Sequence, residues 1–118
     1  MPLIQVDLDA DVYETLGDRI SAEIHQAQID ALGTPPDDLF QVFRPRAAGE
    51  LKYDAGYNGL ARTSLLLIQI TMVHMFPVAT KRALFVAIAD RLVELGIKRD
   101  DIHIAVTENG FEDWFAGK

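Results

Sequence analysis

An internal repeat constrains the fold of this chain more than any other feature of its sequence. Residues 33–39 return 63 residues later as residues 96–102: each stretch holds a glycine, three further residues, and Asp-Asp before a leucine or isoleucine. The strand and helix patterns that precede these stretches match best at an offset of 64 residues. The chain therefore predicts one domain, residues 1–118, built from two β-α-β units in residues 1–63 and 64–118.

Local patterns place the elements of both units. The first strand alternates, with Ile4, Val6 and Leu8 on one side, and a helical spacing follows it. Asp11 and Glu14 have the spacing of a capping box at the start of that helix. The expected elements are a strand at 1–8, a helix from Asp11 to Gly33, a strand at 37–43, a loop at 44–63 with a short hairpin near 51–53, a strand at 65–73, a helix from Pro77 to Gly96, a strand at 100–106 and a tail without periodicity.

Two such units predict an α+β fold. A β-α-β connection pairs its strands in parallel and is right-handed, so two copies give a four-stranded mixed sheet with both helices on one face. If a local two-fold axis relates the units, the first and third strands run antiparallel. The other face of the sheet is half apolar, so we expect a homo-oligomer to cover it. Its apolar residues are Leu3, Leu65, Leu67 and Val73.

The composition excludes several classes of function. The net charge of −7 argues against a nucleic acid or an acidic membrane as partner, because both require a basic surface. The chain has no cysteine, and its three histidines share no ligand spacing, so we expect no metal site. It has no phosphate loop, nucleophile elbow or dinucleotide fingerprint, so we expect no cofactor. It has no targeting sequence and no apolar stretch that spans a bilayer, which favours a cytoplasmic protein.

Pro2 is the first candidate for chemistry. Removal of Met1, which is usual before a small residue, would leave Pro2 with a free secondary amine at the mouth of the first strand. An α-amino group titrates near ~8 in water and burial lowers that pKa, so the amine could transfer protons near neutral pH. The alternative is a proline that only begins a strand. Parallel pairing brings Asp38 near Pro2, and the assumed two-fold axis brings His74 and Phe76 toward it.

These residues resemble the tautomerase superfamily, and within it the malonate semialdehyde decarboxylase subgroup. The resemblance covers nearly the whole chain and includes Pro2-Leu3-Ile4, His25, Asp37-Asp38-Leu39-Phe40-Gln41, Arg62-Thr63-Ser64, Glu108-Asn109 and Asp113-Trp114. It implies a homotrimer with the active site between subunits. It also implies that Pro2 is the catalytic acid or base, and that Asp38 lies beside the proline nitrogen as part of the decarboxylase machinery.

The sequence departs from this family where the family binds a carboxylate. Two arginines follow the third strand in the decarboxylases, and His74 and Phe76 occupy those positions here. A histidine offers at best a partial charge near neutral pH, and a phenylalanine offers none. Val12 and Phe40 stand at the arginine positions of the related 4-oxalocrotonate tautomerases. The missing charge could come from a neighbouring subunit or from Arg44, Arg46 or Arg62.

The sequence thus predicts an enzyme that acts on a small carbonyl compound or enol acid, with keto–enol tautomerisation as its reaction. The alternatives are a decarboxylase or hydratase of the malonate semialdehyde type, and an inactive trimeric binding protein of the same fold. Pro2 and Asp38 are the candidate catalytic residues, and His74, Phe76 and Trp114 the candidate substrate-binding residues. Structural roles compete with these: a turn carboxylate for Asp38, a polar strand end for His74, packing for Phe76 and a tail anchor for Trp114.

Overall fold

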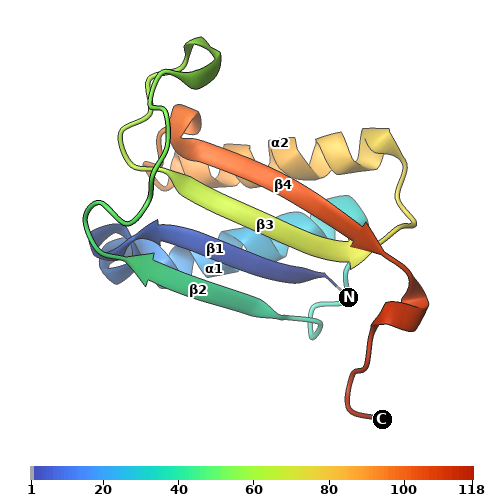
Figure 1. Cartoon of the computed structure of the whole chain (residues 1–118). Helices are drawn as coiled ribbons and strands as arrows, with labels where there is room; N and C mark the ends of the chain where they lie inside the picture. Colours follow the sequence, from blue (N-terminus) through green and yellow to red (C-terminus); the bar gives the residue numbers. More distant parts are fainter. Residues whose placement is uncertain (1) are drawn as a thin grey trace.

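The structure, a computed structural model, describes residues 2–118, so the expected removal of Met1 lies outside the described residues. Figure 1 shows one sheet with both helices against the same face. Neither helix combines the length and the apolar character that crossing a membrane requires, over the part of the chain that is described. In chain order the helices and strands are β1 (Leu3–Asp9), α1 (Ala10–Leu32), β2 (Gln41–Arg46), β3 (Leu66–Val73), α2 (Val78–Glu94) and β4 (Ile102–Asn109), with short 3-10 turns at Tyr57–Gly59, Arg99–Asp101 and Phe111–Asp113.

The strand order β2-β1-β3-β4 confirms the duplicated β-α-β fold. β1 pairs with β2 in parallel, and β3 pairs with β4 in parallel. The two units meet where β1 and β3 run antiparallel, with Gln5 opposite Gln69 at the centre of the ladder. Because the central pairing is antiparallel, the start of β1 lies at the same end of the sheet as the end of β3.

The core lies between the sheet and the two helices. The strand alternation predicted from sequence holds, since Ile4, Val6 and Leu8 are almost fully buried against the helices. The helices meet them with residues at helical spacing, such as Ile20 and Ile24 of α1. The buried cluster consists of Ile4, Val6, Leu8, Ile20, Ile24, Ala27, Leu66, Ile68, Ile70, Met72, Leu84, Ile88 and Leu92.

Several local expectations were wrong. α1 begins at Ala10 after Asp9 and has no side-chain hydrogen bond at its cap; the Asp11 carboxylate accepts the neighbouring Val12 N–H instead, so the capping box does not form. The predicted second strand starts too early, because residues 35–38 form a turn in which the Asp38 N–H donates to the Pro35 carbonyl at 3.0 Å. The predicted hairpin near 51–53 is irregular loop.

Candidate functional site

A cavity of about 120 Å³ opens at the mouth of β1. The antiparallel β1–β3 pairing places Pro2 against the end of β3, and the C-terminal tail leaves β4 at the same end of the sheet (Figure 1). Pro2 is buried there. The lining is mainly apolar and comprises Pro2, Leu32, Thr34, Met72, Val73, Met75, Phe76, Phe111 and Trp114.

Three of the predicted site residues therefore meet at this cavity: Pro2, Phe76 and Trp114. They come from the start of β1, the segment between β3 and α2, and the tail. The Trp114 Nε1 donates to the Asn109 side-chain oxygen at 2.7 Å, which fixes the indole beside the end of β4. Sequence reasoning brought Phe76 toward Pro2 but gave no position for Trp114, and the catalytic and binding roles of all three stay predictions.

Asp38 and His74 lie at the same end of the sheet without lining the cavity. Asp38 is half-buried in the turn that precedes β2. The His25 Nε2 lies 2.8 Å from the Pro36 carbonyl, so α1 holds that turn in place. The His74 side chain is 78% exposed, and its Nδ1 lies 3.2 Å from a Glu108 oxygen.

The Glu108 carboxylate forms a small charged cluster with His74 and a lysine that sequence reasoning missed. The Lys81 Nζ donates to Glu108 Oε1 at 3.0 Å, and this hydrogen bond, followed by the contact with His74, lowers the pKa of the Glu108 carboxyl. His74 thus faces a carboxylate of its own chain. This arrangement weakens the expectation that His74 replaces a carboxylate-binding arginine.

Sequence reasoning did not name the other six lining residues as part of a site: Leu32, Thr34, Met72, Val73, Met75 and Phe111. Thr34 follows the glycine that ends α1, and the repeat gave no reason to treat it differently from its counterpart in the second unit. Phe111 lies in a tail without periodicity, so nothing local marked it. The tail lies close to Pro2 because β4 is long enough to end, at Asn109, at this end of the sheet.

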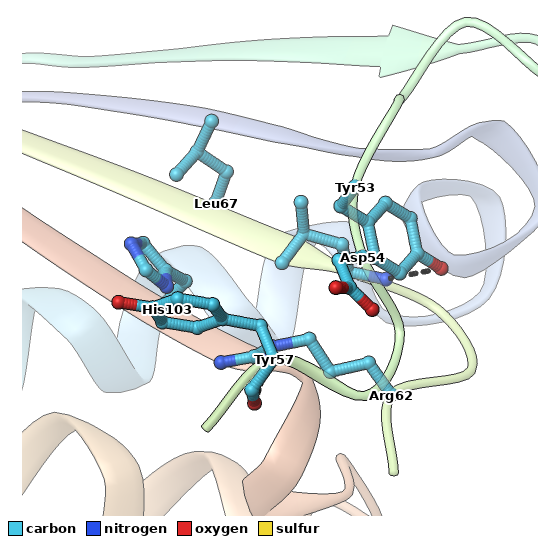
Figure 2. Close-up of a pocket in the computed structure, with 7 residues that line it drawn as sticks. Tyr53, Asp54, Tyr57, Arg62, Leu67 and His103 are labelled. Atoms are coloured by element: carbon cyan, nitrogen blue, oxygen red, sulfur yellow. Dashed lines mark hydrogen bonds between the residues drawn. The ribbon is translucent and has the colours of Figure 1, made fainter. Parts of the chain in front are cut away.

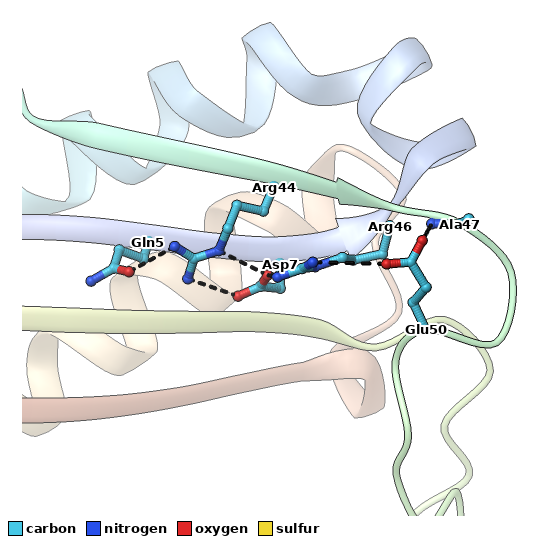
Figure 3. A network of polar contacts seen from close by, with 6 residues as sticks. All are labelled: Gln5, Asp7, Arg44, Arg46, Ala47 and Glu50. Atoms are coloured by element: carbon cyan, nitrogen blue, oxygen red, sulfur yellow. Dashed lines mark hydrogen bonds and ion pairs between the residues drawn. The ribbon is translucent and has the colours of Figure 1, made fainter.

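None of the three candidate arginines lines the Pro2 cavity of the described subunit. Arg62 lies beneath the long loop before β3, at a different cavity (Figure 2). Arg44 and Arg46 instead converge on Asp7 across the open face of the sheet (Figure 3). The Arg44 guanidinium also donates to the Gln5 side-chain oxygen, and the Arg46 Nη1 lies 3.8 Å from the Glu50 Oε2.

A duplicated β-α-β subunit with a proline at the mouth of its first strand defines a protein of the tautomerase fold. The sequence profile of the family described as Tautomerase enzyme matches residues 37–117, and the chain belongs to this family. The probable tautomerase YusQ of Bacillus subtilis (strain 168) is 35% identical over 119 residues, covering 99% of this chain and 94% of YusQ.

Two solved structures are similar to the chain. FG41 malonate semialdehyde decarboxylase, inhibited by 3-bromopropiolate, has a TM-score of 0.92 and 28% sequence identity, and the match covers 98% of this chain and 89% of that one. The F6 fused 4-OT, described as an asymmetric trimer, shares the fold with a TM-score of 0.81 at 17% identity, over 98% of this chain and 92% of its own.

Proposed function

We propose that this chain is an enzyme in which Pro2, once Met1 is removed, acts as general acid and base in the keto–enol tautomerisation of a small enol acid or carbonyl compound. The observation that supports this most is the position of Pro2, buried in a mainly apolar cavity with Phe76 and Trp114. Membership of the tautomerase family adds independent support.

The surroundings of Pro2 favour proton transfer. An α-amino group in water has a pKa near ~8, and an apolar cavity disfavours the charged ammonium, so burial increases the neutral fraction at physiological pH. As a base, the Pro2 nitrogen takes the proton from the enol hydroxyl. The resulting enolate then receives a proton at its α-carbon from the Pro2 ammonium, which gives the ketone and restores the neutral amine. Asp38 is proposed to assist from the neighbouring turn.

Decarboxylation is the second candidate reaction, because the chain is similar to FG41 malonate semialdehyde decarboxylase over nearly its full length. That reaction requires a firm hold on the substrate carboxylate, which a guanidinium provides with two hydrogen bonds. His74 and Phe76 cannot reproduce it, and His74 already faces Glu108. We therefore rank tautomerisation first. An inactive binding protein of the same fold is the remaining alternative.

The open face of the sheet supports a homotrimer. Two of the apolar residues expected on it, Leu65 and Val73, are already buried within the single chain. Leu3 and Leu67 are half-buried, and Val42 on β2 is 43% exposed. A face of this kind is typical of a contact between subunits. The F6 fused 4-OT, which has the same fold, is a trimer. The proposed trimer would cover the Val42 side of the open face, on β1 and β2, and complete the cavity at Pro2 with residues of a neighbour.

The test is the Pro2→Ala variant with phenylenolpyruvate as substrate. We expect loss of ketonisation by a factor of at least ~10², the usual contribution of a positioned acid or base. Pro45→Ala is the matched control, since Pro45 is exposed and pairs with Leu8 at the opposite end of the sheet. An intact-mass spectrum establishes that Met1 is absent from the sample.

Two outcomes would count against the proposal. An unchanged rate in Pro2→Ala would remove Pro2 from the mechanism. A wild-type protein that releases carbon dioxide from malonate semialdehyde but leaves phenylenolpyruvate unchanged would favour the decarboxylase. A wild-type pH–rate profile adds a further check, because the activity should rise as the Pro2 ammonium loses its proton.

A further inference from the structure

A second cavity, of about 260 Å³, lies beneath the long loop before β3, at the end of the sheet away from Pro2. Figure 2 shows the side chains of Tyr53, Asp54 and Tyr57, which belong to the loop, beside those of Leu67 on β3 and His103 on β4. A water molecule takes about 30 Å³ of liquid volume, so this cavity has room for a small organic molecule. The lining residues are Tyr53, Asp54, Tyr57, Arg62, Leu65, Leu67 and His103.

Arg62 is the unusual member of this lining. It is only 9% exposed, and its guanidinium donates one hydrogen bond, to the Tyr57 carbonyl at 3.0 Å. Within residues 2–118 it has no carboxylate within ion-pair distance, unlike Arg44, Arg46, Arg91 and Arg99. A buried cation without a counter-ion is costly, and the Tyr57 ring, 5.9 Å from the guanidinium carbon, compensates only part of that cost.

The other polar groups of the cavity leave Arg62 available. The Asp54 Oδ1 accepts the Gly56 N–H at 2.9 Å, which turns that carboxylate toward its own loop. The Tyr53 hydroxyl accepts the Leu65 N–H at 3.4 Å, so its own proton remains for a ligand. His103 is exposed on β4 at the edge of the cavity and offers a further ring N–H.

We propose that this cavity binds the carboxylate of a small organic acid. Arg62 supplies the counter-ion, with Tyr53 as an additional donor. The ring of Tyr57 and the side chains of Leu65 and Leu67 enclose the apolar body of the acid. Asp54 repels a second negative charge, so the site selects a monocarboxylate. This proposal does not depend on the chemistry of Pro2.

The test uses 3-phenylpropanoate as the probe and 3-phenylpropanamide as its neutral counterpart, titrated calorimetrically against the Pro2→Ala protein so that no turnover intervenes. We expect the acid to bind at least ~10-fold more tightly than the amide, because a charge-assisted hydrogen bond to Arg62 is lost with the amide. Arg62→Gln should remove that preference. Arg99→Gln is the control, since Arg99 is exposed and pairs with Asp90 at the surface.

Two further variants keep the test decisive if Arg62→Gln does not fold. Asp54→Asn should tighten binding of the acid and leave the amide unchanged, because only the acid is repelled by the Asp54 charge. Leu67→Phe should weaken both by filling the cavity. Proton NMR locates the site, since the His103 ring signals should shift on addition of the acid while those of His25 and His74 should not.

Three results would overturn the proposal. The first is equal affinity for acid and amide in the parent protein, which includes the case of no binding by either. The second is an acid preference that Asp54→Asn does not increase and Arg62→Gln does not reduce. The third is an acid that shifts the signals of His74 rather than those of His103, which would place the binding at the other end of the sheet.

Discussion

Replacing Asp7 with asparagine would measure how much the charged cluster on the open face stabilises the subunit. Asp7 is 5% exposed, and its carboxylate accepts four hydrogen bonds of 2.7 to 3.2 Å from Arg44 and Arg46. Asparagine keeps one acceptor oxygen, but it removes the charge and directs an amide N–H toward guanidinium donors. The variant leaves two cations close together without their shared counter-ion.

The size of the effect follows from burial. A hydrogen bond to a charged group contributes about 1.5–3 kcal/mol, and four of them to one carboxylate are not additive. Both arginine side chains are 36% exposed, so water solvates them when the carboxylate is lost and reduces the penalty. We expect Asp7→Asn to lower the free energy of unfolding by about 2 kcal/mol at neutral pH.

The pH dependence separates this electrostatic effect from a packing defect. The hydrogen bond from Arg44, aided by Arg46 and opposed by burial, holds the pKa of the Asp7 carboxyl below its ordinary value of 3.8. A lowered pKa in the folded state means that the stabilisation is complete above the ordinary value and is lost as the pH falls through the folded-state pKa. The difference between wild type and Asp7→Asn should therefore be constant down to that ordinary value and then shrink.

Urea unfolding followed by circular dichroism, at fixed protein concentration and from about pH 7 to about pH 2, measures this difference. Asp90→Asn is the control, because Asp90 pairs with Arg99 on the exposed surface and should change stability by less than about 0.5 kcal/mol. A deficit in Asp7→Asn that stays the same size at the lowest pH would refute the electrostatic explanation. No deficit at neutral pH would refute the proposed stabilisation altogether.

Two further predictions concern the long loop and the assembly. Asp101 is buried and accepts the Thr63 N–H at 2.8 Å and the Ser64 N–H at 3.2 Å, so Asp101→Ala should cost about 2–3 kcal/mol in urea unfolding. Asp100→Ala removes one exposed bond to Ala61 and should cost less than about 1 kcal/mol; equal losses in the two variants would contradict this assignment. The apolar part of the open face predicts a trimer in sedimentation velocity at micromolar concentration, and a monomer there would contradict it.

The repeat made the topology predictable from sequence. A β-α-β connection fixes the pairing within each unit, and the alternation of Ile4, Val6 and Leu8 fixes which face of β1 meets the helices. The position of Pro2, Phe76 and the end of β3 at one rim required, in addition, that a two-fold axis relate the two units. The two-fold relation between the units was an assumption, and the antiparallel β1–β3 ladder confirms it.

Features that depend on irregular backbone could not be predicted in the same way. The Asp-Asp pair predicts the start of a strand in both units. In the first unit it belongs to a turn, and in the second to a 3-10 turn. The Asp101 carboxylate of that 3-10 turn accepts a backbone hydrogen bond from the loop before β3. β4 extends to Asn109 because β3 pairs with it as far as Val73, although the apolar alternation in the sequence of β4 ends earlier. The Arg62 cavity depends on how the loop before β3 folds back over the sheet, and the sequence of that loop has no periodic pattern from which its path could be predicted.

The two-fold relation also creates two similar strand mouths, of which the proposed function uses only one. Leu66 occupies in the second unit the place that Pro2 occupies in the first, and a cavity of about 270 Å³ lined by Leu8, Val12, Leu66 and Ile97, among others, faces it. There the backbone continues into Leu65, so the nitrogen is an amide that does not titrate. If Pro2 has the proposed role, the second opening can therefore hold a ligand but cannot supply an α-amine for proton transfer.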